Sequence, residues 1–163
     1  MPTIQEIQKR KIGFFDYNDL ATATTPISVT GGGGYVDLTN DGAGSFTNTT
    51  YKPTSMTTIW NTGTNLFDFS ELALGDEIFI RIDVDVVTSS VNTEIDIKLL
   101  LANGGTPYDI LFLNATDIKA TGTYKFVQLN KIYMGDANTL DNTAKFQIQS
   151  DKTCTVKVVG WYV

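Results

Sequence analysis

Few residues of this chain have the types and spacing that enzymatic chemistry requires. The sequence contains no histidine, which removes Ser-His-Asp and Cys-His nucleophilic catalysis and most zinc sites. Asp83 and Asp85 lie two apart on one face of a predicted strand, so their carboxylates sit roughly 7 Å apart, a separation that a glycosidase could use. The sequence indicates no sugar cleft beside them. We therefore interpret them as part of a solvated sheet face, with Arg81 and Lys98 as cross-strand partners.

A candidate ion site lies in residues 135–142, where acidic and amide side chains cluster. The stretch departs from the EF-hand loop, because Leu140, Asp141 and Gln147 stand where that loop has a ligand, a glycine and a glutamate. Whether the loop from Asp136 to Asp141 binds calcium stays open, and no cofactor is expected. The single cysteine, Cys154, shares strand parity with two valines and is predicted to be a small buried core residue.

The composition favours strands over helices as the elements that position these side chains. Thr, Asn, Asp and Gly are abundant, whereas Glu, Lys and Arg are sparse, a mixture that disfavours helices and favours strands joined by tight turns. At 163 residues, with 42% hydrophobic and 18% charged residues, the chain fits one globular domain.

Two long alternating segments carry the clearest structural signal. In residues 77–88 every second side chain is Ile or Val, and residues 95–101 repeat the pattern, as expected for half-buried strands. We predict that they form a long antiparallel hairpin. Shorter strands are predicted at 27–30, 35–38, 56–60, 108–113, 123–133, 145–149 and 153–163. About eight one-sided strands must stack as two sheets, which predicts an all-β, two-sheet antiparallel sandwich of jelly-roll type, with an immunoglobulin-like topology as the alternative.

The first 25 residues are predicted to be an N-terminal arm on a sandwich domain that spans residues 26–163. Residues 2–13 read as a short helix with capping-box spacing between Thr3 and Glu6, and a frayed terminus is the alternative. The arm carries two isoleucines on one helical face, three successive cations and three aromatic anchors. These candidate interface residues are Ile4, Ile7, Lys9, Arg10, Lys11, Phe14, Phe15 and Tyr17.

Two further aromatic residues are expected on the surface. Phe79 lies on the polar face of its strand, and Trp161 has the opposite strand parity to Cys154. If that parity holds, Trp161 faces outward and belongs to an interface. The alternative is a bulge at Gly160 that reverses the parity and buries Trp161.

The charge distribution limits the classes of partner. The net charge is −6 and the pI is about 4.5, so neither nucleic acid nor an anionic membrane is an expected partner. No apolar run is long enough to span a bilayer, and residues 1–12 lack the apolar region of a signal peptide. Residues 1–12 carry +2 and the rest of the chain −8. A basic arm on an acidic body suggests that the arm docks on an acidic neighbour, although the three cations also suit a helix C-terminus.

Several segments of the sequence resemble segments of jelly-roll accessory proteins from tailed-bacteriophage virions. They cover residues 66–163 and include 68–76 (DFSELALGD), 77–88, 93–96 (TEID), 132–138 (IYMGDAN), 144–151 and 158–163 (VVGWYV). The resemblance implies a non-enzymatic capsid decoration or cement protein, or a domain of a head or tail fibre, located on the virion. It also implies a homotrimer that contacts the major capsid protein or another virion protein. A receptor- or glycan-binding fibre domain is the alternative function.

Overall fold

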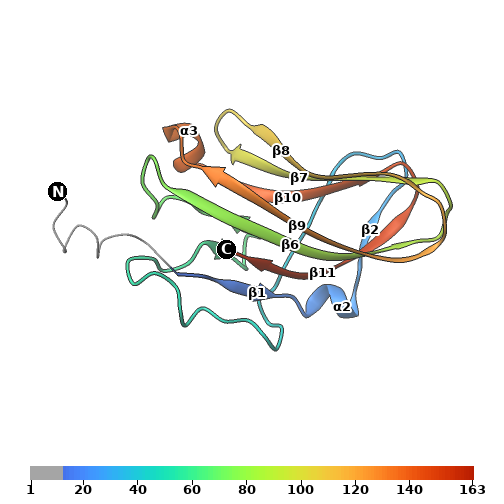
Figure 1. The fold of residues 1–163 in the computed structure, drawn as a ribbon, viewed down its shortest axis with the longest axis horizontal. Helices are drawn as coiled ribbons and strands as arrows, with labels where there is room; N and C mark the ends of the chain where they lie inside the picture. The colour runs from blue at the N-terminus through green and yellow to red at the C-terminus, as the bar shows by residue number, and fades with distance from the viewer. Residues whose placement is uncertain (1–12) are drawn as a thin grey trace.

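The computed structural model describes residues 13–163, with the backbone alone at residue 116. It is a sandwich of two antiparallel sheets, which lie as two layers in Figure 1. Residues 13–163 form eleven strands and two four-residue helices. In chain order these are β1 (Asp16–Asn18), α2 (Ala21–Thr24), β2 (Ile27–Val29), β3 (Val36–Asp37), β4 (Trp60–Asn61), β5 (Leu66–Phe67), β6 (Glu77–Thr88), β7 (Thr93–Asn103), β8 (Tyr108–Ile118), β9 (Gly122–Tyr133), α3 (Ala137–Leu140), β10 (Thr143–Ser150) and β11 (Cys154–Tyr162).

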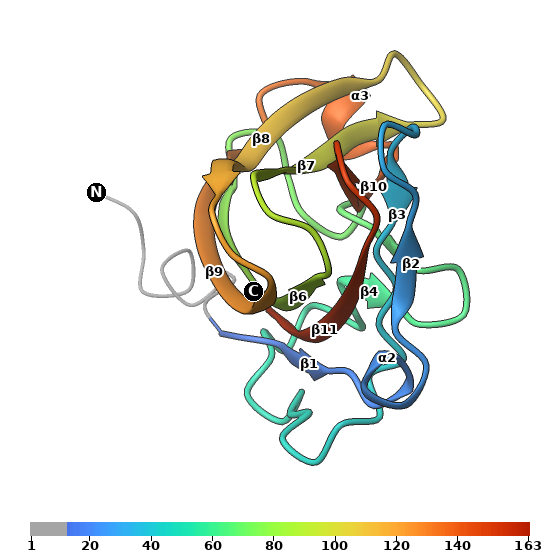
Figure 2. The ribbon, with the colours of Figure 1, turned by 90° about the vertical axis from the view of Figure 1, so that its right-hand side faces the viewer.

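The strand pairings form a rolled-up ribbon. Sheet A has the order β1-β11-β6-β9 with β2 also on β11, and sheet B has the order β4-β5-β10-β7-β8 with β3 also on β10. The pairs β7·β8, β6·β9, β3·β10 and β2·β11 are nested in sequence, each enclosing the one before it. Successive nested pairs fall in alternate sheets, and Figure 2 shows the ribbon curling around the core. The predicted all-β, jelly-roll-like sandwich is therefore confirmed.

The predicted hairpin of the two long alternating segments is wrong. Strand β6 pairs with β11 and β9 in sheet A, whereas β7 pairs with β10 and β8 in sheet B. The connection at residues 89–92 thus carries the chain from one sheet to the other. The predicted faces are right, since Ile80, Ile82, Val84 and Val86 of β6 meet the buried residues of β7 across the core. Alternation specifies a buried face, but it does not specify the partner strand.

Trp161 is fully buried, so the prediction that it faces outward is wrong and the alternative, a bulge beside Gly160 that buries it, is confirmed. The register of β11 against β6 shifts between Val158 and Gly160, and the extra residue, Val159, is exposed. This bulge restores the pairing of Trp161 with the inward-facing Ile82. The indole then joins the rings of Trp60, Phe67 and Phe146, with centroid separations of 5.1–6.4 Å.

The predicted boundary between arm and body at residue 25 is also wrong for the described part of the arm. Strand β1 pairs with β11, and the rings of Phe15 and Tyr17 lie in the core, 6.1 Å apart. Behind β1, the buried Asn40 donates to the Tyr17 carbonyl and accepts from the indole N–H of Trp60. Residues 13–25 therefore belong to the sandwich. The predicted helix at residues 2–13 lies almost wholly outside the described residues.

Candidate binding surface

The two carboxylates of β6, Asp83 and Asp85, have cationic side chains as neighbours. Arg81 donates to both oxygens of Asp83, with Nε to Oδ1 at 2.7 Å, and this hydrogen bond raises the pKa of Arg81 above its ordinary value. Asp85 lies in register between Lys157 and Lys125. The expected partnership with Lys98 is wrong, because Lys98 is in sheet B and binds Asp109 at 2.9 Å. The arrangement is that of a charged sheet face with cross-strand partners, but the expectation that it is fully solvated is wrong at Asp83, which is buried.

The acidic loop after β9 acts as a helix cap. Asp136 is the N-cap of α3, and its Oδ1 accepts from the backbone N–H and the hydroxyl of Thr139 at 2.7 and 2.9 Å. The bond from the Thr139 N–H lowers the pKa of Asp136 below its ordinary value. Across residues 13–163, no group of three or more Cys, Asp and Glu side chains is placed to hold a metal ion.

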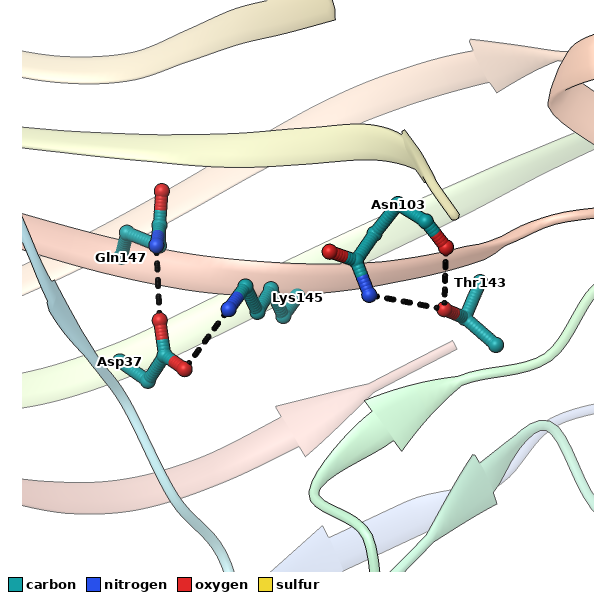
Figure 3. Close-up of polar contacts among 5 residues, drawn as sticks. All are labelled: Asp37, Asn103, Thr143, Lys145 and Gln147. Atoms are coloured by element: carbon teal, nitrogen blue, oxygen red, sulfur yellow. Dashed lines mark hydrogen bonds and ion pairs between the residues drawn. The ribbon is translucent and has the colours of Figure 1, made fainter. Parts of the chain in front are cut away.

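On sheet B, polar side chains of β3, β7 and β10 form a network in which they satisfy one another. In Figure 3, Lys145 and Gln147 of β10 both point at Asp37 of β3, and they donate to its two carboxylate oxygens at 2.8 and 2.7 Å. Asn103 and Thr143 exchange two hydrogen bonds where β7 ends and β10 begins. The surface over β3 and β10 therefore offers little apolar area to a partner. The exposed apolar residues of this sheet, Tyr108 and Leu111, lie on its edge strand β8.

The outer face of sheet A is different at its β9 edge. Three apolar residues of β9 and one of β6 are each more than half exposed, and we call them the β9 face: Val127, Leu129, Tyr133 and Phe79. In the register of the two strands, Phe79 lies opposite Lys131, and Leu129 and Tyr133 are its diagonal neighbours. Diagonal neighbours on one face are within reach of large side chains. Val127 lies two residues from Leu129 on the same face of β9, so the four apolar side chains share one region of the sheet. Two cations are interspersed among them, with Lys131 between Leu129 and Tyr133 and Arg81 opposite Leu129.

A pocket of about 420 Å³ adjoins the β9 face at the end of β6. Its wall is made by the buried side chains of Phe15, Met56, Ile59 and Leu72, with the C-terminal Val163 beside them. Its opening carries the half-exposed rings of Phe14 and Phe79 and the carboxylates of Asp76 and Glu77. The pocket thus combines an apolar interior with an acidic rim, and we call it the arm-root pocket because Gly13 also lines it.

The point where the N-terminal segment joins the body is fixed by backbone contacts. The N–H of Phe14 donates to the Tyr51 carbonyl at 3.2 Å, and the N–H of Phe15 donates to the Val163 carbonyl at 2.7 Å. A Cβ added to Gly13 would lie 2.5 Å from the Tyr51 oxygen and 2.7 Å from the Pro53 ring. Only glycine fits this close approach of two chain segments without a backbone shift.

The predicted interface residues fall into three groups: exposed, buried, and outside the described residues. Phe14 is exposed at the pocket, whereas Phe15, Tyr17 and Trp161 are core residues and cannot serve as exposed contacts. Ile4, Ile7, Lys9, Arg10 and Lys11 lie outside the described residues. Sequence reasoning identified exposed Phe79 correctly. It missed Val127, Leu129 and Tyr133, although their alternation with inward-facing residues between 123 and 133 was the available signal.

No family model matches the chain, and none of the curated proteins is significantly similar to it. Among the described residues, no helix has the length and the apolar character needed to cross a membrane.

Proposed function

We propose that this chain is a non-enzymatic accessory protein of a tailed-phage virion, and that it decorates and cements the expanded capsid shell by binding the major capsid protein. The observation that carries the proposal is the β9 face. Exposed apolar side chains that gather on one sheet face mark a site of protein interaction. The surface over β3 and β10 of the other sheet presents a polar network instead.

The resemblance of residues 66–163 to virion accessory proteins directs the proposal to a phage shell. The jelly-roll fold is compatible with it, and the acidic body keeps free copies soluble and apart from the packaged genome. Binding that is selective for the expanded shell stabilises that form by mass action. No step of this mechanism needs a catalytic group or a cofactor.

Co-sedimentation with expanded heads of the cognate phage, stripped of accessory proteins, tests the proposal. Wild-type protein is expected to bind saturably, at a fixed ratio per capsomer. Leu129→Ser removes one large apolar group from the β9 face, and burial of a leucine contributes about 1.5–3 kcal/mol, so the affinity is expected to fall by about ten- to a hundredfold. Leu111→Ser is the matched control, because Leu111 is 54% exposed but lies on β8 in the other sheet.

Two results would contradict the proposal. Equal weakening by both substitutions would show that the β9 face is not the contact. An absence of saturable binding by the wild-type protein would reject the cement function itself, and a receptor- or glycan-binding fibre role would then be tested with host cells and glycans.

A further inference from the structure

The arm-root pocket has the chemistry of a site for a short peptide with apolar and basic side chains. Buried Met56, Ile59 and Leu72 supply apolar walls within a volume of about 420 Å³. Asp76 and Glu77 place carboxylates at the opening. Glu77 pairs with Lys131 at 2.9 Å, but each side chain is about half exposed, so a further cation can share this carboxylate. An apolar site with a few charged groups at its rim fixes both the burial and the direction of a ligand.

Residues 1–12 of the chain have the complementary composition. Ile4 and Ile7 are spaced three apart, as two side chains on one face of a helical turn would be. Lys9, Arg10 and Lys11 follow them, so the segment carries +2 while the rest of the chain carries −8. Two apolar groups followed by cations therefore match an apolar pocket with an acidic rim, both in type and in order.

A second copy is a better source of this segment than the same chain. Residues 8–12 (QKRKI) contain none of the residue types that dominate turns. A segment that continued from Gly13 without a turn would carry Ile4 and Ile7 away from the pocket that Gly13 lines. Gly13 itself is enclosed by Tyr51 and Pro53, and Phe14 is held by its backbone bond. Six extended residues reach about 20 Å from Gly13, which is enough to cross to an adjacent copy.

We propose that residues 4–11 of one copy dock in the arm-root pocket of a second copy, with Ile4 and Ile7 in the apolar interior and the three cations at the carboxylate rim. Since each copy has one segment and one pocket, the exchange closes either as a reciprocal two-fold dimer or as a cyclic ring. The homotrimer implied by the sequence resemblance is one such ring. This inference concerns self-assembly and does not depend on the proposed capsid binding.

Disulfide trapping in the full-length chain tests the proposal. The variant Ile7→Cys with Phe79→Cys places one thiol in the segment and one at the pocket opening, while the native Cys154 is buried and does not compete. Covalent dimers and higher oligomers are expected on a non-reducing gel after mild oxidation. They should exceed by at least tenfold those of the control pair, Ile7→Cys with Leu111→Cys, whose second thiol is equally exposed on the opposite sheet.

Each other outcome overturns the proposal. A disulfide within one chain, seen as a monomer of altered mobility, would place the segment in its own pocket. Covalent oligomers equally abundant in the control pair would reflect random collision, and no disulfide would mean that the segment does not visit the pocket.

A complementation experiment supports the trapping result with chains that contain no added cysteine. Ile4→Asp with Ile7→Asp impairs the segment, and Phe79→Asp impairs the pocket by placing a charge at its exposed opening. Each variant alone is expected to be monomeric by light scattering, and an equimolar mixture is expected to form a 1:1 complex through the one intact contact. A mixture that stays monomeric while the wild-type chain forms oligomers would contradict the exchange.

Discussion

The two tryptophans of the chain give a matched test of the core. Trp60 and Trp161 are both fully buried, and their rings meet edge to face with centroids 5.7 Å apart. The indole N–H of Trp60 donates to the buried Asn40 carbonyl at 3.0 Å, whereas the indole N–H of Trp161 has no hydrogen-bond partner among the described residues. The same substitution therefore removes a satisfied hydrogen-bond donor at Trp60 but an unpaired one at Trp161.

Substitution by phenylalanine should cost less at Trp161 than at Trp60. The loss of apolar contact and the small cavity are similar at both sites and largely cancel in the comparison. Trp60→Phe also leaves the Asn40 carbonyl buried without its donor, which costs about 1–3 kcal/mol. Trp161→Phe removes a buried donor that has no partner within residues 13–163, so the cost of burying that donor, which is of the same size, disappears. We expect Trp60→Phe to be the more destabilising by at least about 2 kcal/mol, or about 4–8 °C in Tm for a domain of this size.

Urea unfolding of the two variants measures this difference, because linear extrapolation gives the free energy of unfolding for each. Each variant keeps a single tryptophan, so fluorescence also reports whether the remaining indole is buried. Equal costs, or a larger cost at Trp161, would refute the assignment of the two indole environments. A solvent-exposed emission spectrum from Trp161 in the Trp60→Phe variant would refute the bulge at Val159.

Three further predictions concern the N-terminal junction, the cap of α3 and the cysteine. Gly13→Ala should destabilise the protein by about 1–3 kcal/mol in urea unfolding, because its methyl group would overlap the Tyr51 carbonyl and the Pro53 ring; an unchanged midpoint would contradict the close approach. The hydrogen bond from the Thr139 N–H holds the pKa of Asp136 below its ordinary value, so its capping contribution is present above the unfolded-state pKa and is lost as pH falls through the folded-state pKa. Asp136→Ala should therefore lower Tm at pH 7, and the difference from wild type should shrink in acid; a constant difference would contradict the role of the charge. Burial raises the pKa of the Cys154 thiol, and the residue should react with a thiol reagent only upon unfolding; rapid reaction in the native state would show that β11 is open there.

Much of the fold follows from local patterns in the sequence. Alternation in residues 77–88 and 95–101 gave the correct buried faces of β6 and β7, and turn residues gave the approximate limits of β9, β10 and β11. The pairing of β6 with β9 rather than β7 depends on a connection that changes sheets, and no local propensity encodes that choice. The two-residue strands β4 and β5 depend on packing of Trp60 and Phe67 in the shared aromatic core, which only the assembled fold shows.

The candidate site was harder to predict than the fold. The parity of β11 pointed Trp161 outward, and a single inserted residue, Val159, reversed it. The arm-root pocket is assembled from segments near residues 13–15, 53–59, 72–79 and 163, which are distant in sequence and meet only through the roll of the sheets. The sequence showed only the segment that is proposed to dock there, through the basic and apolar residues of the first twelve positions.

The thermal stability of the expanded capsid shows directly whether this chain cements a phage shell. Calorimetry of stripped expanded heads would be recorded at increasing concentrations of the protein. If the protein cements the shell, the melting temperature of the shell rises and then saturates at a fixed ratio of chain to capsomer, and Leu129→Ser shifts the rise to higher concentration. A shell whose melting temperature is unchanged by the wild-type protein would contradict the claim.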